Sequence, residues 1–317
     1  MFTVASLQRV VGLVVSLLVA SLLIFLSTNL LPGDVAQIML GTNASPGEAA
    51  ELRQQLGLDR PLPLRYLEWL GGMLRGDLGT SMITGRSVVS QIGPRLGVTA
   101  WLVGLGMLLA LLLALPMGAF AAVRRRHPSG LVVSVASQLG LAIPAFWAGM
   151  GLVVLFAVWL RVLPAGGYVP LADDPVEWAR HLVLPVASLS LVQASILTRY
   201  VRSSVISVLG TDYFRTARAM GWSTLGALWR HGTRNIAISL TTVIGLQLAT
   251  LLVGAIIIEQ VFALPGLGSR LLQAVAQRDL VLVQGIVLLL VAAVLVINFL
   301  VDTSYRLFDP RLGQAAR

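Results

Sequence analysis

The chain has 317 residues, of which 56% are hydrophobic and only 12% are charged, and its formal net charge is +9. Soluble globular domains carry about 25% charged residues, so this composition indicates an integral membrane protein. The absence of cysteine excludes a disulfide framework and a cysteine-bound metal. All 23 basic residues are arginine, and a chain without lysine can contain neither a nucleotide-binding P-loop nor a Schiff base.

Six stretches of roughly 20 apolar residues, the length that crosses a bilayer, predict six transmembrane helices and an all-α polytopic membrane protein. The stretches are Val10–Leu31, Val98–Val123, Leu131–Leu160, Leu182–Tyr200, Ile236–Ile258 and Val281–Val301. The first stretch is too long for the apolar region of a signal peptide. It is followed by a proline and an acid rather than by a small-residue cleavage site. We therefore expect it to remain in the protein as a span.

Arginine placement predicts that both termini lie in the cytoplasm, because short cytoplasmic loops carry an excess of basic residues. The arginines of the inner segments are then Arg9, Arg124, Arg125, Arg126, Arg199, Arg202, Arg215, Arg218, Arg230, Arg234, Arg306, Arg311 and Arg317. The short outer segments hold Arg161, Arg180, Arg270 and Arg278 with the acids Asp173, Asp174, Glu177 and Asp279. The net positive charge is mostly a charge of the cytoplasmic face, and nucleic acid is not needed as a partner.

The long segment between the first two spans, residues 32–97, predicts a small helical subdomain outside the membrane. Ser45 stands before Pro46, and Glu48 follows the serine by three residues, which is a capping-box pattern. Gly57 predicts the end of that helix. The stretch PLPLRYLEWLGGMLRGDLG predicts a second, amphipathic helix. Two interpretations stay open: the subdomain receives a soluble partner, or it caps the helix bundle.

Signals of enzymatic chemistry are weak, and we expect neither catalytic residues nor a metal site. The three histidines, His127, His181 and His231, are far apart in the chain and are predicted on different sides of the membrane. The neighbouring carboxylates Asp173 and Asp174 are expected in a solvated turn. The sequence therefore favours a membrane protein that moves or binds something over one that catalyses a reaction.

Polar residues inside the predicted spans are candidates for a translocation pathway, since each is costly to place in lipid. Glu259 lies near one end of the fifth span, and Gln193, Thr242 and Gln247 lie in the fourth and fifth spans. The alternative is helix packing through interhelical hydrogen bonds or, for Glu259, a carboxylate bonded to backbone at the interface. No series of acids or histidines crosses the bilayer, which argues against a proton-coupled carrier.

The segment TDYFRTARAMGWSTLGALWRHGTRN, residues 211–235, lies between the fourth and fifth spans and holds four arginines against one acid, Asp212. A helix of about nine residues is ~13 Å long. Such a helix is too short to span the bilayer, but it can lie across the surface and fill a groove in a partner. The alternative is a basic segment whose arginines reflect only the positive-inside rule.

Helical spacing divides this short segment into two predicted strips. Arg215, Arg218 and Trp222 fall close to one face, at i, i+3 and i+7. Ala217 and Gly221 are four residues apart and are expected to form a smooth strip beside them. The arginines alone fit the positive-inside rule, but the small-residue strip suits a surface that another protein grips.

The segment resembles the EAA loop of binding-protein-dependent ABC importer permeases, and most closely the dipeptide/oligopeptide/nickel branch, in which it reads close to DYxRTARAKG. The matching residues are Asp212, Tyr213, Arg215, Thr216, Ala217, Arg218, Ala219, Gly221, Trp229, Arg230, His231, Arg234 and Asn235. Further stretches agree in order along nearly the whole chain. They are LLPGD at 30–34, LGLDRPL at 56–62, GDLGTS at 76–81, HLVLP at 181–185, VFALPGLG at 261–268, RDLVLVQG at 278–285 and DPRL at 309–312.

The chain also departs from this branch at a few positions. Met220 stands where lysine is usual, Val35 and Ser239 stand where proline is common, and Gly232 replaces a usual alanine. The long outer segment after the first span resembles that of the B-type subunit. Four regions are expected: the first span at 1–31, the outer subdomain at 32–97, a permease core at 98–303 with its coupling loop at 204–235, and a cytoplasmic tail at 304–317.

The resemblance implies a type I importer permease fold in the inner or plasma membrane of a prokaryote, with the loop as a coupling helix docked in a cytoplasmic ATPase. The coupling residues that it implies are Asp212, Tyr213, Arg215, Thr216, Ala217, Arg218, Ala219, Gly221 and Trp222. The implied partners are a second related permease, two ABC ATPases, an extracytoplasmic substrate-binding protein and membrane lipid. This chain would be a non-catalytic subunit without a cofactor, since the ATPases would bind ATP and Mg²⁺.

The expected function is to form half of the translocation pathway for di- and oligopeptides. One alternative keeps the fold and changes the cargo to nickel complexes, haem or another small solute. A second alternative is a stand-alone channel or secondary carrier, which would need no ATPase.

Overall fold

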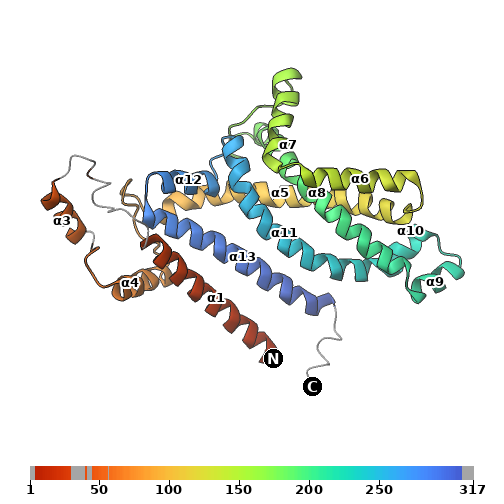
Figure 1. Ribbon diagram of the computed structural model, residues 1–317, viewed down its shortest axis with the longest axis horizontal. Coiled ribbons are helices and arrows are strands. Elements are labelled where there is room, and N and C mark those ends of the chain that lie inside the picture. The colour runs from red at the N-terminus through yellow and green to blue at the C-terminus, as the bar shows by residue number, and fades with distance from the viewer. Residues whose placement is uncertain (1–3, 30–39, 41–44, 56, 309–317) are drawn as a thin grey trace. The chain divides into compact units, whose positions relative to one another are not determined.

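The computed structural model describes residues 4–29, 40, 45–55 and 57–308. The motifs at 30–34 and 309–312, Val35 and the end of the tail lie outside these described residues. Within them the structure is helical apart from turns and one isolated bridge between Thr80 and Ser87. The first helices in chain order are α1 (Val4–Asn29), α3 (Pro46–Gln55), α4 (Leu62–Leu74), α5 (Val88–Val123), α6 (Pro128–Ala142), α7 (Ala145–Leu152) and the π-helical turn η1 (Val153–Trp159). They are followed by α8 (Pro175–Leu209), α9 (Asp212–Ala219), α10 (Thr224–Ala227), the π-helical turn η2 (Leu228–Gly232), α11 (Thr233–Val261), α12 (Leu267–Ala276) and α13 (Leu280–Phe308) (Figure 1). The predicted all-α class is confirmed.

Five of the described helical stretches are long and apolar enough to cross a membrane. They are Gln8–Asn29, Val88–Val123, Pro175–Leu209, Thr224–Val261 and Leu280–Ser304. Each contains or closely overlaps a predicted span, but several helices are longer than predicted. Hydropathy marks only the part of a helix that lies in hydrocarbon, whereas helical hydrogen bonding continues into the headgroup region and beyond it.

The third predicted span, Leu131–Leu160, is not one straight helix, and this expectation is corrected. Helix α6 is followed by α7 and η1, and the two parts are bent by 99°. Pro144 causes the break, because its ring forces Ile143 out of the helical region, to φ −95° and ψ 118°. The pair forms a sixth span if both parts count as one broken helix, or else a re-entrant pair.

The chain divides into two compact units. The first contains Met1–Gly97 and Gly266–Val296, and the second contains Val98–Pro265 and Ile297–Arg317. The long helices α5 and α13 contribute residues to both units.

The core of the first unit is formed by the first turns of α5 together with α12 and α13. The buried residues of this core are Val88, Ile92, Leu267, Ala274, Leu282, Val283 and Ile286. The GDLGTS loop closes on the start of α13, where the Ser81 hydroxyl donates to the buried carboxylate of Asp279. Gly285 allows this packing, since a Cβ there would lie 2.6 Å from Cγ1 of Val88. Two of the motifs found in the sequence therefore meet in the structure.

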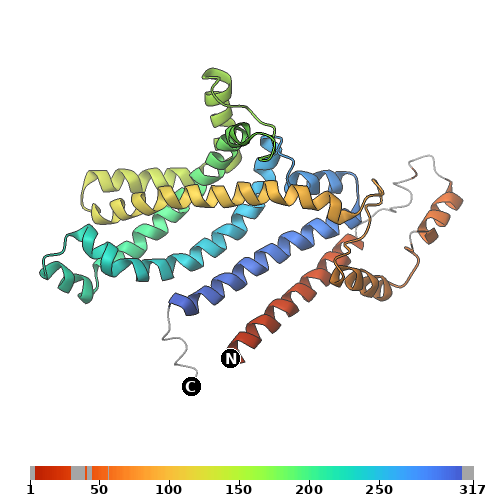
Figure 2. The same ribbon diagram turned by 180° about the vertical axis from the view of Figure 1, so that it is seen from behind.

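The second unit is organised around α8, which packs against α6, α7 and α11. Its deepest side chains, on α5, α8, α11 and the turn that follows α11, include Leu102, Leu184, Leu197, Ile258, Phe262 and Leu264. Small residues allow close helix contacts, as at Gly118 of α5, where a Cβ would lie 2.6 Å from Cβ of Val201. Figure 2 shows α8 crossing α5 and α6 at an angle in this unit, with α9 and α10 at its end.

Candidate functional site

The predicted surface helix exists as α9, which follows α8 after a turn at Gly210 and Thr211. It has 8 residues, so it is ~12 Å long and too short to cross a bilayer. Asp212 lies in its first turn and Arg218 in its last. Both charges complement the helix dipole, which is positive at the N-terminus and negative at the C-terminus.

Gly221 ends this helix and is not part of it. Its amide donates to the carbonyl of Arg218 at 3.1 Å, and the amide of Trp222 donates to the carbonyl of Ala217 at 3.2 Å. These two bonds form a Schellman motif, which needs a left-handed residue, and Gly221 has φ +91°. The predicted strip of Ala217 and Gly221 on one helix face is therefore wrong, because the helix stops before the glycine.

The inner face of α9 is anchored by Phe214 and Ala217, which are only 4% and 5% exposed. They are three residues apart and so lie on the same side of the helix. The other members of this buried cluster are Ala122, Val201, Val205, Val208, Ala227, Leu228 and Leu240. Helix α9 thus packs against α8 and against the first part of the α10–η2–α11 helix.

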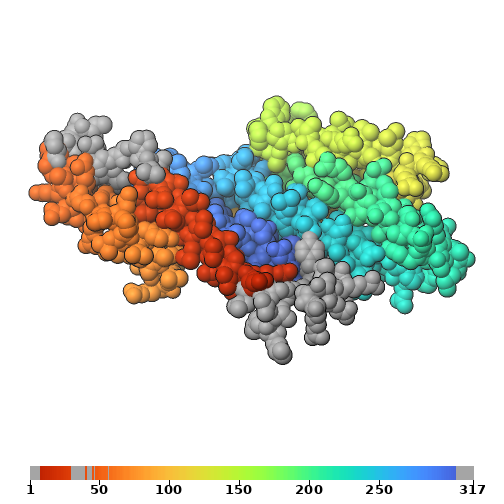
Figure 3. Space-filling view, turned by 60° about the horizontal axis from the view of Figure 1, so that its bottom comes forward, coloured from red at the N-terminus to blue at the C-terminus, as the bar shows by residue number. Residues whose placement is uncertain are grey.

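The opposite face of α9 and the turn after it are open. The exposed residues are Asp212, Tyr213, Arg215, Thr216, Arg218, Ala219, Met220, Gly221 and Trp222. The ion pair between Arg215 and Asp212, at 3.4 Å, is solvent-exposed and contributes little to stability. Figure 3 shows this part of the chain, around residues 210–235 in green and teal, at one end of the second unit. All but one of the predicted coupling residues are therefore accessible to a partner, and the exception is Ala217.

Contacts across the loop hold its two ends together. The amide of Asn235 donates to the hydroxyl of Tyr213 at 2.8 Å, although the two residues are far apart in sequence. The guanidinium of Arg218 donates to the carbonyl of Trp222. The indole ring of Trp222 meets the imidazole of His231 edge-on, with centroids 5.7 Å apart. These three contacts thus hold Tyr213, Arg218, Trp222, His231 and Asn235 in one fixed arrangement.

Sequence reasoning missed Phe214 as a site residue. Its signal was present, because Phe214 and Ala217 are apolar or small residues three positions apart in a helix that is otherwise polar. The structure also exposes Leu225 and Trp229 on the next turns of chain. These residues were not predicted to belong to the accessible surface, and hydropathy alone does not tell which side of a short helix is covered.

Two of the predicted pathway residues meet between α8 and α11. The side-chain amide of Gln193 donates to the side-chain oxygen of Gln247 and, at 3.3 Å, to its backbone carbonyl. Both side chains are buried. Thr242 is not part of this pair and is exposed on α11. This pairing is the kind of hydrogen bond that joins helices in membranes.

Glu259 is completely buried near the end of α11. Its carboxylate accepts a hydrogen bond from the hydroxyl of Thr99 of α5 at 2.6 Å. The carboxylate thus joins two helices of the second unit in this structure. A place for Gln193, Thr242, Gln247 and Glu259 along a translocation pathway stays a prediction.

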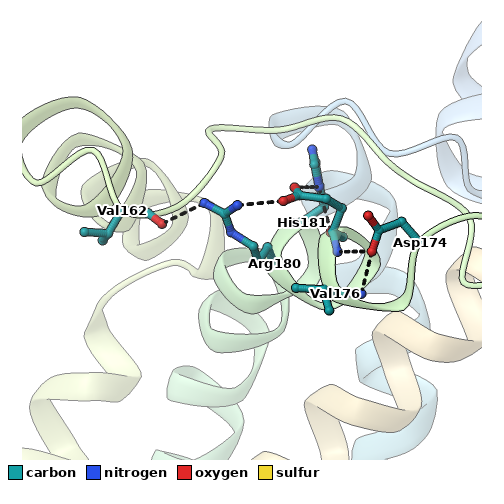
Figure 4. Close-up of polar contacts among 6 residues, drawn as sticks. Val162, Asp174, Val176, Arg180 and His181 are labelled. Atoms are coloured by element: carbon teal, nitrogen blue, oxygen red, sulfur yellow. Dashed lines mark hydrogen bonds and ion pairs between the residues drawn. The ribbon is translucent and has the colours of Figure 1, made fainter.

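Of the two carboxylates before α8, Asp174 has a structural role (Figure 4). Asp174 caps the helix by accepting from the amides of Val176 at 2.9 Å and Glu177 at 3.1 Å. Arg180 bonds to Glu177 at 2.6 Å and to the carbonyl of Val162 at 3.3 Å, which ties α8 to the loop after η1. In the described part of the chain, no cluster of three or more histidine, aspartate and glutamate side chains could hold a metal ion.

Two family models match the chain. Residues 114–314 match the binding-protein-dependent transport system inner membrane component, and residues 2–102 match the N-terminal region of such membrane components. Among solved structures, the MetNI methionine ABC transporter in an inward-facing conformation matches with a TM-score of 0.56 and 18% identity. The match covers 70% of this chain and 97% of that one, and it shows a shared fold.

Curated relatives match over almost their whole length. A peptide transport system permease protein of Brucella melitensis is 39% identical over 312 residues, which cover 98% of this chain and 99% of the relative. The glutathione transport system permease protein of Salmonella typhimurium is 40% identical over 307 residues, which cover 96% and 97% of the two chains.

Proposed function

Since the chain belongs to the family of binding-protein-dependent transport system inner membrane components, we propose that it forms half of the translocation pathway of a peptide importer. Family membership makes it a multi-pass permease subunit of an ATP-driven importer, which works with an ATPase and a substrate-binding protein. The proposal adds a second, related permease for the other half of the pathway and two ATPase subunits. It also places both termini in the cytoplasm, as the arginine distribution favours.

The proposed cargo class is short peptides. The relatives are named for the transport of peptides and of glutathione, which is itself a tripeptide. Identities of 39% and 40% over nearly the full length support a shared chemical class. We propose that the substrate-binding protein selects among peptides by length and side chain.

The coupling part of the proposal is supported by the two faces of α9, one of which is exposed while the other is buried against α8. Its exposed face holds Arg215 and Arg218, which suit a partner groove, and its other face is fixed to α8 through Phe214 and Ala217. A partner whose shape depends on bound nucleotide can then bias the position of α8 and α11. Such a bias is what coupling requires, because a ligand shifts a conformational equilibrium only through its different affinity for the two states.

The absence of lysine agrees with this division of labour. A P-loop needs a lysine that reaches the nucleotide phosphates, and this chain has none. The chain is therefore proposed to be non-catalytic and to need no cofactor, with ATP and Mg²⁺ bound by the ATPase subunits.

Charge reversal on α9 tests the coupling assignment. Arg218→Glu, in the complete importer, is expected to reduce the uptake of a radiolabelled dipeptide by about tenfold or more, since breaking a buried charge pair at an interface costs about 2–5 kcal/mol. The matched control is Arg126→Glu, an exposed arginine outside the segment with the same change of charge. Gly221→Trp is less specific, because it also strains a residue at φ +91°.

The amount of each variant in the membrane fraction is measured on the same samples. Normal insertion with lost uptake for Arg218→Glu, and normal uptake for Arg126→Glu, supports coupling through α9. Unchanged uptake for Arg218→Glu contradicts it. Failure of every variant and of the wild type to take up the dipeptide would instead reject the cargo, and competition by other peptides would then be measured.

A further inference from the structure

Helix α4 carries a strip of exposed leucines on one of its faces. Leu64, Leu67 and Leu74 fall at i, i+3 and i+10, and they are 47%, 61% and 78% exposed. No residue of α4 is buried. Exposing apolar area to water costs about 25 cal/mol per Å², and a contiguous exposed patch marks a protein or membrane contact. The strip therefore needs a cover that the described part of the chain does not supply.

A second face of α4 packs against α1. The ring of Phe25 on α1 lies 5.4 Å from that of Tyr66 and 6.0 Å from that of Trp69, measured between centroids. The hydroxyl of Tyr66 lies 2.9 Å from that of Ser21, which is completely buried. Both ribbon views show α4 beside the C-terminal end of α1 (Figures 1 and 2). The position of α4 relative to α1 is thus set by aromatic and hydrogen-bond contacts.

These contacts lie inside the apolar span of α1, which is Gln8–Asn29. Ser21 precedes Asn29 by eight residues, or ~12 Å along the helix at 1.5 Å per residue. The hydrocarbon core of a bilayer is about 30 Å thick. The hydroxyl of Tyr66 therefore reaches well into the leaflet at the Asn29 end of α1, and the neighbouring Leu67 cannot be far from that depth.

The polar side chains of α4 lie on its remaining face and point to the end of the span. The guanidinium of Arg65 donates to the side-chain oxygen of Asn29 at 2.8 Å. Glu68 pairs with Arg60 at 2.9 Å, and both of these side chains are exposed. This distribution, with charges at the end of the span and leucines elsewhere, is that of a helix lying in a membrane interface.

An apolar groove of about 380 Å³ opens beside α4. All of its lining residues are apolar, among them Leu17 and Leu18 of α1, Leu70 and Met73 of α4, and Leu288 and Leu289 of α13. Leu17 and Leu18 are farther from Asn29 than Ser21 is, so the groove extends toward the middle of the bilayer. Such a lining has no polar group to offer water or a charged partner.

We propose that α4 is embedded in the leaflet at the Asn29 end of α1, with acyl chains of membrane lipid covering the leucine strip and entering the groove. The favoured occupant is hydrocarbon rather than protein, because the strip and the groove lie at the depth of the apolar span and continue the exposed apolar surface of α1. In the proposed topology this leaflet is the outer one. The inference depends on the chain spanning a membrane and is independent of cargo and of ATPase coupling.

Water exposure at neighbouring positions gives the first test, in the complete importer in native membranes. The chain contains no cysteine, so Leu67→Cys and Glu68→Cys need no background substitutions. A polyethylene-glycol maleimide should label position 67 about tenfold or more slowly than position 68, because the reactive thiolate is disfavoured in hydrocarbon. The labelled chain is read by its own mass shift. Equal labelling would overturn the proposal.

A photo-crosslinker separates lipid from protein as the cover. p-Benzoylphenylalanine replaces Leu67 and, as a control within the span, Leu23 of α1, which is 58% exposed. Phospholipid adducts at both positions, detected by mass spectrometry of the isolated chain, are the expected result. A protein adduct at position 67, from the second permease or the binding protein, overturns the proposal. So does a lipid adduct at position 23 with none at position 67.

Discussion

The buried amide pair of Gln193 and Gln247 joins α8 to α11 through two hydrogen bonds. Removing one partner leaves the other unpaired in an apolar interior, whereas removing both leaves no orphaned group. Gln193→Leu and Gln247→Leu are therefore each expected to destabilise the protein. The double variant should lose less than the sum of the two, with a coupling energy of ~0.6 to ~1.7 kcal/mol.

The measurement is a double-mutant cycle on unfolding of the detergent-solubilised protein, with peptide uptake followed in parallel. Additive losses of stability would show that the two amides do not interact. Loss of uptake in variants of unchanged stability would instead favour the pathway role predicted from the sequence. The stability and uptake measurements together thus distinguish a packing role of Gln193 and Gln247 from a transport role.

Glu48 gives a prediction about pH. The amide of Ser45 donates to the carboxylate of Glu48 at 2.8 Å, as does its hydroxyl, and together these bonds lower the pKa of Glu48 below its ordinary value. A lowered folded-state pKa stabilises helix α3 above the ordinary pKa, about 4.3. This contribution is lost as the pH falls through that value and then through the lowered one.

Hydrogen-exchange protection of the α3 amides, corrected for intrinsic rates, should accordingly fall between about pH 7 and about pH 3. Glu48→Gln is the matched control, because glutamine also serves in a capping box but does not titrate. Its protection should change less over the same range. An equal pH dependence in both proteins would mean that the carboxylate does not support the helix.

At the scale of whole helices, Gly118 sets how closely α5 approaches α8. A Cβ at this position would lie 2.6 Å from Cβ of Val201 and 2.8 Å from the carbonyl of Thr198. Gly118→Ala is therefore expected to cost ~1–3 kcal/mol through overpacking. Gly104→Ala on the same helix meets nothing within 4 Å and should be neutral or slightly stabilising.

The comparison of these two variants isolates helix packing from helix propensity, since both replace a glycine of α5 by alanine. Thermal or denaturant unfolding in detergent measures both. Equal stabilities of Gly118→Ala and Gly104→Ala would show that α5 and α8 separate easily.

The sequence predicted well those elements whose causes are local. Apolar runs located the spans, and Ser45, Glu48 and Gly57 marked both ends of α3, as the capping-box bonds and the left-handed Gly57 confirm. Pro144 was a local signal too, but averaging hydropathy over the third span concealed the bend that it causes. The ends of the long helices were underestimated, because hydropathy does not report helix outside the hydrocarbon.

The sequence predicted where the candidate site lies in the chain, but not which of its residues are exposed. The motif located α9, yet which of its residues face outward depends on the packing of Phe214 and Ala217 against α8. The helical pattern wrongly continued through Gly221, because helical spacing carries no information about where a helix stops. The pairs Gln193–Gln247 and Tyr213–Asn235 join residues distant in sequence, and a single sequence does not contain such pairings.

For the whole molecule, the prediction concerns its assembly. Extraction from native membranes in mild detergent, followed by mass analysis, is expected to recover the chain with a second six-span permease and two ATPase chains. The exposed face of α9 and the missing P-loop lysine both lead to this expectation. A homo-oligomer without an ATPase, under conditions that preserve a control ABC complex, would contradict it.

The length of the helix that follows α9 has a mechanical consequence. The stretch Thr224–Val261 contains 38 residues, which makes a rod ~57 Å long, nearly twice the thickness of the hydrocarbon core. One end of the rod begins beside α9, and the other carries Glu259 in contact with Thr99. A tilt of only ~5° about one end displaces the other by ~5 Å, the rise of one helical turn. The length of this helix thus converts a rotation of a few degrees about its end beside α9 into a displacement of several ångströms at the end that carries Glu259.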